Sequence, residues 1–315
     1  MSTPDRVGPE SLREYSVDSL AADLGLTQRR LAHLAARIGK HGYSQFPLHG
    51  DSKTRVISAP RPWLSGIQRG LVDTVFARLP VANCVYSQRG RDVVLNAEQH
   101  LNHDYMAVMD VCDCFPSTTY VMVRDAFDRM GFVPAVAGLL TRMVTLNGRL
   151  PQGPPSSPAV LNCVLGPIDA DLSTIAENHG AVYTRYMDDL CFSGNEALSG
   201  LRRLVSRRLR SSGYSLAERK TKLFGPSDRH TVTKIVVSSS LQPEPEYLKQ
   251  LASALRDYHR TRSSRSRASI VGRIQWVKRL NPELGASLER DLVARHSSRG
   301  GRQPSSAKRK LATLS

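Results

Sequence analysis

Two adjacent carboxylates lie between two short β-prone runs, and this segment constrains the fold more than any other part of the chain. Residues 181–187 and 190–194 flank Asp188 and Asp189, a pattern typical of a β-hairpin. Neighbouring carboxylates repel each other, and where they do not face open water a divalent cation is the usual compensation. The alternative is an ordinary exposed acidic turn.

A third carboxylate follows an apolar segment that predicts a buried strand. Residues 105–109 lead into Asp110, and residues 120–130 carry an apolar stripe at helical spacing. We expect Ser117 as the N-cap of that helix and Gly131 as its stop. Ligand sites commonly open at the carboxyl ends of buried strands. Taken alone, Asp110 is more often a cap or a hydrogen-bonded structural residue.

A loop rich in proline and glycine precedes the most apolar helix. It contains Gln152 and Gly153, and we expect Ser157 as the helix cap with Pro158 at the first helical position. Pro167 falls inside the apolar pattern, so a kink or a break is expected there. The glycine permits a ligand to approach the backbone closely, although a plain linker is the alternative.

Two further patterns lie nearer the N-terminus. Leucines in residues 16–38 surround a turn at Gly25, which predicts two short helices similar to a helix-turn-helix. Such pairs are also frequent in ordinary packing. Residues 43–60 predict a β-hairpin with Lys53 and Arg55 near its tip. These bases either hold a triphosphate or are solvated charges.

Positive charge is concentrated near the C-terminus. The 315 residues include 44 Lys and Arg against 28 Asp and Glu, a net charge of +16, which indicates a polyanionic partner. Residues 256–310 hold fifteen bases and four acids, while apolar residues between 244 and 291 recur at helical spacing. We therefore expect basic helices that bind a phosphate backbone, followed after Ser297 by a disordered tail.

Composition excludes several classes of protein. With 40% hydrophobic residues the chain can bury a core, which argues against wholesale disorder. We find no apolar run of about 18 residues and no charged-then-apolar leader, and so expect a cytoplasmic protein with no membrane partner. Five cysteines without a CxxC pair fit reduced thiols better than disulfides or a zinc site.

Carboxylates in these places suit phosphoryl transfer. Transfer from a nucleoside triphosphate uses two Mg²⁺ ions about 4 Å apart, so oxygen ligands must converge on one point. Asp110 and Asp188 can meet if their strands are neighbours in one antiparallel sheet.

In order, spacing and residue type, four segments together resemble the reverse transcriptase family. The segment from Asp110 to Phe115 is similar to the first catalytic motif, Leu150-Pro151-Gln152-Gly153 to the second, Tyr186-Met187-Asp188-Asp189 to the YxDD motif, and Lys220-Thr221 to the lysine motif. Within that family the chain most resembles bacterial retron enzymes, because residues 96–100 match their asparagine-alanine-x-x-histidine block. One departure is Lys234, where retron enzymes usually have glycine; it leaves open whether the RNA contact assigned there is kept.

The resemblance implies an α+β right-hand polymerase fold, with fingers, an antiparallel-sheet palm that carries the catalytic aspartates, and a helical thumb. The implied parts are an N-terminal helical segment (1–42), fingers (43–104), a palm with finger helices interleaved (105–240), a basic helical thumb (241–295) and a disordered basic tail (296–315).

The resemblance also implies roles for individual residues. The ligands of two Mg²⁺ ions would be Asp110, Asp188, Asp189 and the backbone carbonyl of Val111, and Lys220 would protonate the leaving pyrophosphate. Phe115 would lie beneath the incoming sugar and exclude a 2′-hydroxyl, with core packing as the alternative. The other implied contacts are nucleotide binding by Lys53, Arg55, Gln152 and Gly153, and RNA binding by Asn96, His100, Arg265, Arg267, Arg273, Lys278 and Arg279.

A retron enzyme would act as an RNA-directed DNA polymerase, a nucleotidyltransferase. It would copy part of a cognate structured non-coding RNA into single-stranded DNA, primed from an RNA 2′-hydroxyl, to give branched RNA–DNA used in antiphage defence. The implied partners are that RNA and its product, dNTPs, an effector protein and host RNase H. The alternatives are another bacterial reverse transcriptase, of the group II intron or diversity-generating type, and a non-enzymatic helix-turn-helix nucleic-acid binder.

Overall fold

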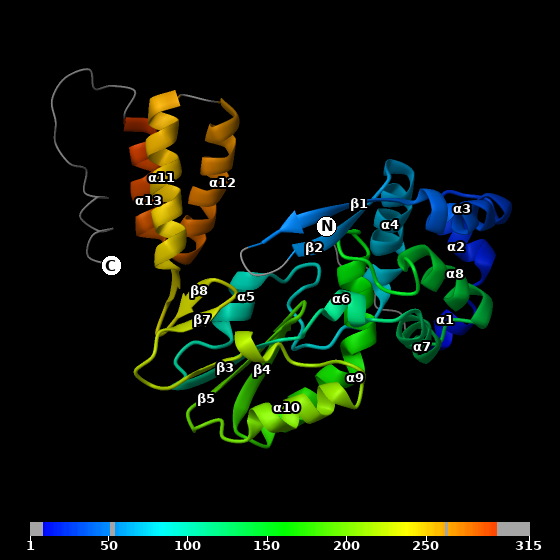
Figure 1. The fold of residues 1–315 in the computed structure, drawn as a ribbon, viewed down its shortest axis with the longest axis horizontal. Helices are drawn as coiled ribbons and strands as arrows, with labels where there is room; N and C mark the ends of the chain where they lie inside the picture. The colour runs from blue at the N-terminus through cyan, green and yellow to red at the C-terminus, as the bar shows by residue number, and fades with distance from the viewer. Residues whose placement is uncertain (1–8, 51–53, 262–263, 295–315) are drawn as a thin grey trace.

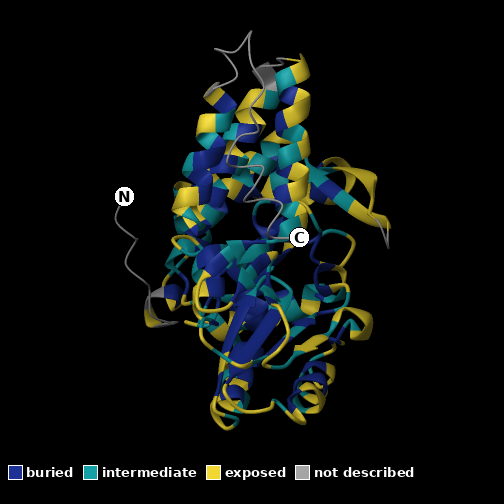
Figure 2. Cartoon of the chain, turned by 90° about the vertical axis from the view of Figure 1, so that its left-hand side faces the viewer, coloured by how far each residue is buried: buried dark blue, intermediate teal, exposed yellow. Residues whose placement is uncertain are grey.

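The computed structural model describes residues 9–50, 54–261 and 264–294, and at its centre lies a four-stranded antiparallel sheet (Figure 1). The strand order is β4-β5-β3-β6. The strands are β3 (Tyr105–Asp110), β4 (Ala181–Tyr186), β5 (Asp189–Gly194) and β6 (Lys222–Phe224). Figure 2 shows buried strands at the centre of the sheet, where β5 is buried at every position after Asp189, whereas the edge strand β6 is largely exposed. The predicted hairpin around the two adjacent aspartates is therefore confirmed as β4 and β5.

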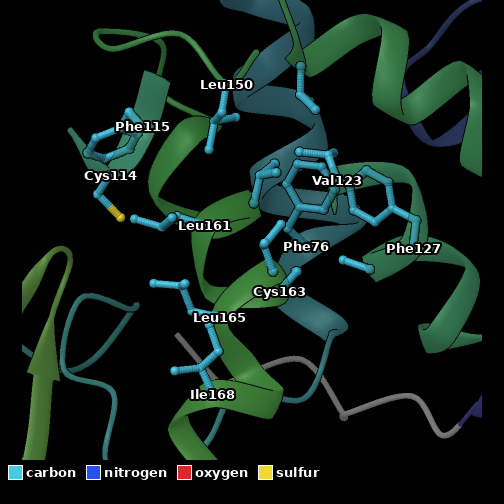
Figure 3. Packing of buried hydrophobic residues seen from close by; sticks show 14 of the residues in the cluster. Phe76, Cys114, Phe115, Val123, Phe127, Leu150, Leu161, Cys163, Leu165 and Ile168 are labelled. Atoms are coloured by element: carbon cyan, nitrogen blue, oxygen red, sulfur yellow. The ribbon is translucent and has the colours of Figure 1, made fainter. Parts of the chain in front are cut away.

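The long helix α9 (Ser157–Glu177) is the main cover of this palm sheet. It packs against β4 and against two further helices, α7 (Tyr120–Met130) and α10 (Leu201–Arg210). Its side chains Leu161, Leu165 and Ile168 belong to the main apolar core (Figure 3). In the part of the chain that the structure describes, α9 alone is long and apolar enough to cross a membrane, and 56% of that stretch is buried inside the fold. Core packing thus accounts for its composition.

Three local details correct the expectations. Helix α7 is capped by Thr119, whose Oγ1 accepts a 3.3 Å hydrogen bond from Met122 N, because Ser117 already ends a separate short helix, α6 (Cys114–Ser117). Ser156 rather than Ser157 is the N-cap of α9, and Ser157 Oγ donates to the Pro151 carbonyl at 2.7 Å. Helix α9 is not broken at Pro167, which lies on its exposed side while the opposite side is held in the core.

The predicted N-terminal helix pair is confirmed, and it packs against the rest of the chain. Short α1 (Pro9–Arg13) is followed by α2 (Val17–Asp23) and α3 (Gln28–His41), and α2 and α3 both contact α8 (Pro134–Val144). Gly25 makes the turn between them with φ of 64°. Leu20, Leu31 and Ile38 are buried in the main core. The leucine pattern therefore has a structural role here.

The basic hairpin consists of β1 (Tyr43–His49) and β2 (Thr54–Pro60), paired antiparallel. Lys53 lies outside the described residues. The chain continues through α4 (Pro62–Thr74), the 3₁₀ turn η1 (Phe76–Arg78) and α5 (Val93–Glu98) to the palm.

A small sheet connects the palm to a bundle of three helices. The sheet contains β7 (His230–Val232), β8 (Ile235–Val237) and β9 (Leu241–Pro243), and the bundle contains α11 (Pro245–Thr261), α12 (Ser264–Leu280) and α13 (Pro282–Ala294). Figure 1 shows this bundle to one side of the palm. Its core includes Leu248, Leu251, Leu255, Ile270, Ile274 and Val277, so the predicted apolar spacing is confirmed. The tail from 295 onward lies outside the described residues.

The unusual Lys234 occupies the two-residue turn between β7 and β8. Thr233 and Lys234 have φ of 46° and 66°, which is the pattern of a type I′ hairpin turn. Glycine adopts such values without strain, whereas a side chain does so at a cost. The preference for glycine here thus has a backbone cause, and the hairpin forms with lysine in its place.

Candidate active site

The three aspartates meet where β3 and the β4–β5 hairpin end. Asp110, the last residue of β3, is the antiparallel partner of Asp189, the first residue of β5. Asp188 lies in the turn between β4 and β5, and its backbone carbonyl accepts a 3.0 Å hydrogen bond from Val111 N. The expectation that these carboxylates come from neighbouring strands is confirmed.

The turn that carries Asp188 is fixed from two sides. Met187 has φ of 56°, a left-handed value that costs a side-chain-bearing residue free energy. Its N–H donates to Ser87 Oγ at 3.0 Å, and its carbonyl accepts from Arg185 Nη1 at 2.8 Å. These contacts hold the strained turn in one conformation.

Arg185 connects this turn to the core through a buried ion pair. Its Nε and Nη2 donate to Asp169 Oδ1 and Oδ2, both at 2.7 Å, and both side chains are 1% exposed. Burial opposes the charged guanidinium, but the Asp169 carboxylate outweighs it and raises the pKa of Arg185 above its ordinary value. Asp169 Oδ1 also accepts from the Tyr183 hydroxyl at 2.9 Å. Sequence reasoning missed this pair, because its only signal is a single charge in an apolar strand and one of three acidic residues in an apolar helix.

The aspartates carry negative charge that their surroundings only partly neutralise. Burial raises the pKa of Asp189 to about 7, and the charges of Asp188 and Asp110 add to the shift. Burial likewise raises the pKa of Asp188, while Lys220 and Arg55 act in the opposite direction. Lys220, in the 3₁₀ turn η2 (Glu218–Lys220), donates from Nζ to Asp110 Oδ1 at 2.7 Å. The site therefore favours an additional cation.

The donor set fits a hard divalent cation in its chemistry. Carboxylate and carbonyl oxygens are the ligands that Mg²⁺ prefers, and they meet at one end of the palm sheet. Within the described ranges, however, no three His, Cys, Asp or Glu side chains are already grouped to hold a metal ion. The ligand roles of Asp110, Asp188, Asp189 and Val111 stay predictions.

The Gln152 loop is attached to the basic hairpin. Ser58 N, in β2, donates to the Gln152 carbonyl at 2.8 Å. Gly153 has φ of 121°, and a Cβ there would lie 3.0 Å from both Ile57 Cγ2 and the Ser58 carbonyl, so glycine is required for this approach. Arg55 lies exposed on the same strand. The structure thus brings Arg55, Gln152 and Gly153 into one region, and their nucleotide contacts stay predictions.

Phe115 is buried in the main apolar core, with 8% of its surface exposed. Figure 3 shows its ring beside the short segment that also carries Cys114. This position satisfies the packing alternative, and the contact with a sugar stays a prediction.

Asn96 and His100 are both buried, each with 1% of its surface exposed. His100 Nδ1 and Nε2 lie 2.7 Å from Ser193 Oγ and Thr184 Oγ1, one hydroxyl on each strand of the catalytic hairpin. Burial, with a smaller effect of His103, lowers the pKa of His100 to about 3. The His100 side chain therefore joins the two strands of the hairpin from inside the palm, and RNA binding by Asn96 and His100 stays a prediction.

The predicted RNA-binding bases of the thumb have different surroundings. Lys278 Nζ pairs with Glu289 at 2.8 Å, and Arg279 pairs with Asp92. Arg273 stacks over the Tyr247 ring at 5.0 Å. Arg267 is exposed, and the side chain of Arg265 lies outside the described residues. Such partly exposed ion pairs are weak and can exchange for phosphate, so RNA binding by these bases stays a prediction.

Comparisons with known proteins agree with this geometry. Residues 40–248 match the family model described as reverse transcriptase (RNA-dependent DNA polymerase). The Retron Mx65 and Retron Mx162 reverse transcriptases of Myxococcus xanthus are 28% and 27% identical to the chain, over 87% and 81% of its length. The alignments span 70% and 61% of those two proteins.

A solved telomerase of Candida albicans shares the fold, with a TM-score of 0.53 at 10% identity over 91% of this chain and 60% of that one. The family model covers more than half of the sequence, and the α+β right-hand fold expected from the motifs is confirmed. The chain belongs to the reverse transcriptase family of RNA-directed DNA polymerases.

Proposed function

We propose that this chain is a retron-type reverse transcriptase that uses two Mg²⁺ ions to copy part of a cognate structured RNA into single-stranded DNA. The observation that carries the proposal is the pairing of Asp110 with Asp189 beside Asp188, in a chain whose curated relatives are retron enzymes. By the same likeness, the proposal includes priming from an RNA 2′-hydroxyl and a branched product. It also includes an effector protein, host RNase H and a cytoplasmic role in antiphage defence.

Each residue of the site has a distinct task in this proposal. Asp110, Asp188, Asp189 and the Val111 carbonyl hold the metal ions, which when bound activate the attacking hydroxyl and neutralise the triphosphate. Arg55 adds positive charge on the fingers side, where it already acts on Asp188. Lys220, which lies 2.7 Å from Asp110, donates a proton to the leaving pyrophosphate. Arg185 and Ser87 keep the Met187 turn in place.

The metal assignment is tested with Asp188→Ala combined with Asp189→Ala. We expect loss of dNTP incorporation in primer extension, because the ligands are removed, while RNA affinity stays within about twofold since the phosphate-binding bases are intact. Asp104→Asn is the matched control: it removes an exposed carboxylate just before β3, at the other end of the strand from Asp110, and should leave extension unchanged. Wild-type extension by the double variant would refute the assignment.

The retron assignment is tested by sequencing nucleic acid that co-purifies with the protein. A retron enzyme should carry short DNA joined to RNA through a 2′,5′ linkage. Linear complementary DNA alone would favour the group II intron or diversity-generating type.

A further inference from the structure

Helix α10 carries five arginines and no acidic residue over ten positions. One side of the helix, with Leu201, Val205 and Leu209, is buried in the main core. The arginines occupy the remaining sides. Neither the proposed chemistry nor the thumb uses them.

Only part of this charge is neutralised by the protein. Arg202 pairs with Glu218 at 2.7 Å, and Arg208 pairs with Asp171 at 2.5 Å. Arg203, Arg207 and Arg210 are exposed, and within the described residues they make no side-chain hydrogen bond or ion pair. Spacings of four and three residues place these three on one stripe of the helix.

This stripe is unfavourable for the isolated protein, because like charges three and four residues apart repel each other. Four of the arginines, with Gly200, Ser206 and Glu218, line a surface hollow of about 550 Å³. The stripe rises about 10 Å along the helix. One strand of a duplex presents a phosphate about every 3.4 Å of axis, and the guanidinium fork matches phosphate oxygens. A phosphate backbone would therefore neutralise the stripe.

The chemistry of the helix favours nucleic acid over an acidic protein. The centres of protein interfaces combine arginine with aromatic side chains and methionine, and none of the exposed large hydrophobic residues of the described chain lies on α10. Figure 1 places α10 at the edge of the molecule opposite the bundle α11–α13, with the palm sheet between them. The stripe thus lies apart from the proposed thumb.

We propose that Arg203, Arg207 and Arg210 form a docking site for the phosphate backbone of a folded RNA, outside the polymerase active site. That this RNA is the cognate template rests on the proposed function. The binding of phosphate groups by the three arginines does not depend on the proposed function. The site would anchor a stem of the RNA on the outer side of the palm while another segment is copied.

The test is the triple variant Arg203→Gln, Arg207→Gln and Arg210→Gln, since glutamine keeps a comparable helix propensity. Binding of a hairpin RNA with a blocked 3′ end, and of duplex DNA of the same sequence, is measured over a range of salt concentrations. For RNA we expect roughly tenfold weaker binding or more at about 0.15 M salt, and a salt slope shallower by about 2 to 3. Extension of a short annealed primer at saturating substrate should not change.

The matched control replaces Arg29, Arg30 and Arg37 with Gln, because these are exposed arginines of helix α3 and their loss changes net charge equally. Similar losses in both triple variants would overturn the proposal in favour of a net-charge effect. Unchanged RNA binding would also overturn it, and loss of a co-purified acidic protein would then assign the stripe to that partner. Equal losses of affinity for RNA and for DNA would support a general phosphate site. A loss of affinity for RNA alone would support a site shaped for RNA. A wild-type protein that binds RNA through α10 but extends no primer would refute only the polymerase proposal.

Discussion

Replacing Arg185 with methionine should lower the free energy of unfolding by about 3–5 kcal/mol, the usual cost of removing one partner of a buried ion pair. The change leaves the Asp169 carboxylate 1% exposed without its two 2.7 Å hydrogen bonds from the guanidinium. Of the contacts described above, only the Tyr183 hydroxyl continues to donate to it. The carboxylate would then have to be buried with its charge largely uncompensated, or be protonated.

The assay is urea unfolding of four proteins at neutral pH: wild type, Arg185→Met, Asp169→Asn and the double variant. Each single change removes the same interaction, so the double variant should be more stable than additivity predicts by at least about 2 kcal/mol. Arg208→Met is the control, because its pair with Asp171 is on the surface and should be worth at most about 1 kcal/mol.

The reasoning would be refuted if Arg185→Met lowered the free energy of unfolding by less than about 1 kcal/mol. It would also be refuted if the effects of the two single changes simply added in the double variant. A second consequence concerns the site. Because Arg185 Nη1 holds the Met187 carbonyl at 2.8 Å, kcat for primer extension should fall at temperatures where the variant is still folded. Wild-type kcat in a folded variant would show that the turn does not need this hydrogen bond.

Two further predictions concern stability. Lowering the pH from 7.5 to 5.5 should reduce the free energy of unfolding by about 1.4 kcal/mol through His100. Because its pKa is lowered from 6.5 to about 3 in the folded protein, the stabilisation by neutral His100 is complete above about pH 6.5 and is lost as the pH falls toward 3. Urea unfolding should show a weaker pH dependence in His100→Gln, and an equal dependence in both proteins would contradict this. Lys234→Gly should raise the free energy of unfolding by about 0.5–1 kcal/mol. The reason is that φ of 66° strains a residue with a side chain by more than the extra chain entropy of glycine costs. A lower melting temperature would show that the contacts of the lysine side chain outweigh the backbone strain.

The sequence predicts the fold correctly where the hydrophobic pattern of a segment alone determines its secondary structure and its position in the core. The apolar run before Asp110 and the β-prone runs around Asp188 predict two strand ends, and their pairing follows from the antiparallel sheet. The apolar period of the thumb likewise predicts its buried seam.

The sequence was insufficient where a polar residue's partner is distant or its exposure is not encoded locally. Asp169 lies in helix α9 and Arg185 lies 16 residues later in strand β4, and nothing nearby in the sequence shows that both are buried. The asparagine-histidine block looks like a surface motif until α5 is packed, which places His100 between two strands. The Arg279–Asp92 pair joins positions 187 residues apart, beyond the reach of any local pattern.

The hydrogen bond from Ser58 N to the Gln152 carbonyl limits how the fingers can move relative to the palm. A second main-chain bond, from Arg61 N to the Gly42 carbonyl at 2.8 Å, ties the base of the same hairpin. The base is therefore continuous with the palm, while the outer part of β1 and β2 is exposed. The hairpin is thus attached at the two residues Ser58 and Arg61, and Arg55 lies on the exposed part of β2 beyond these attachments.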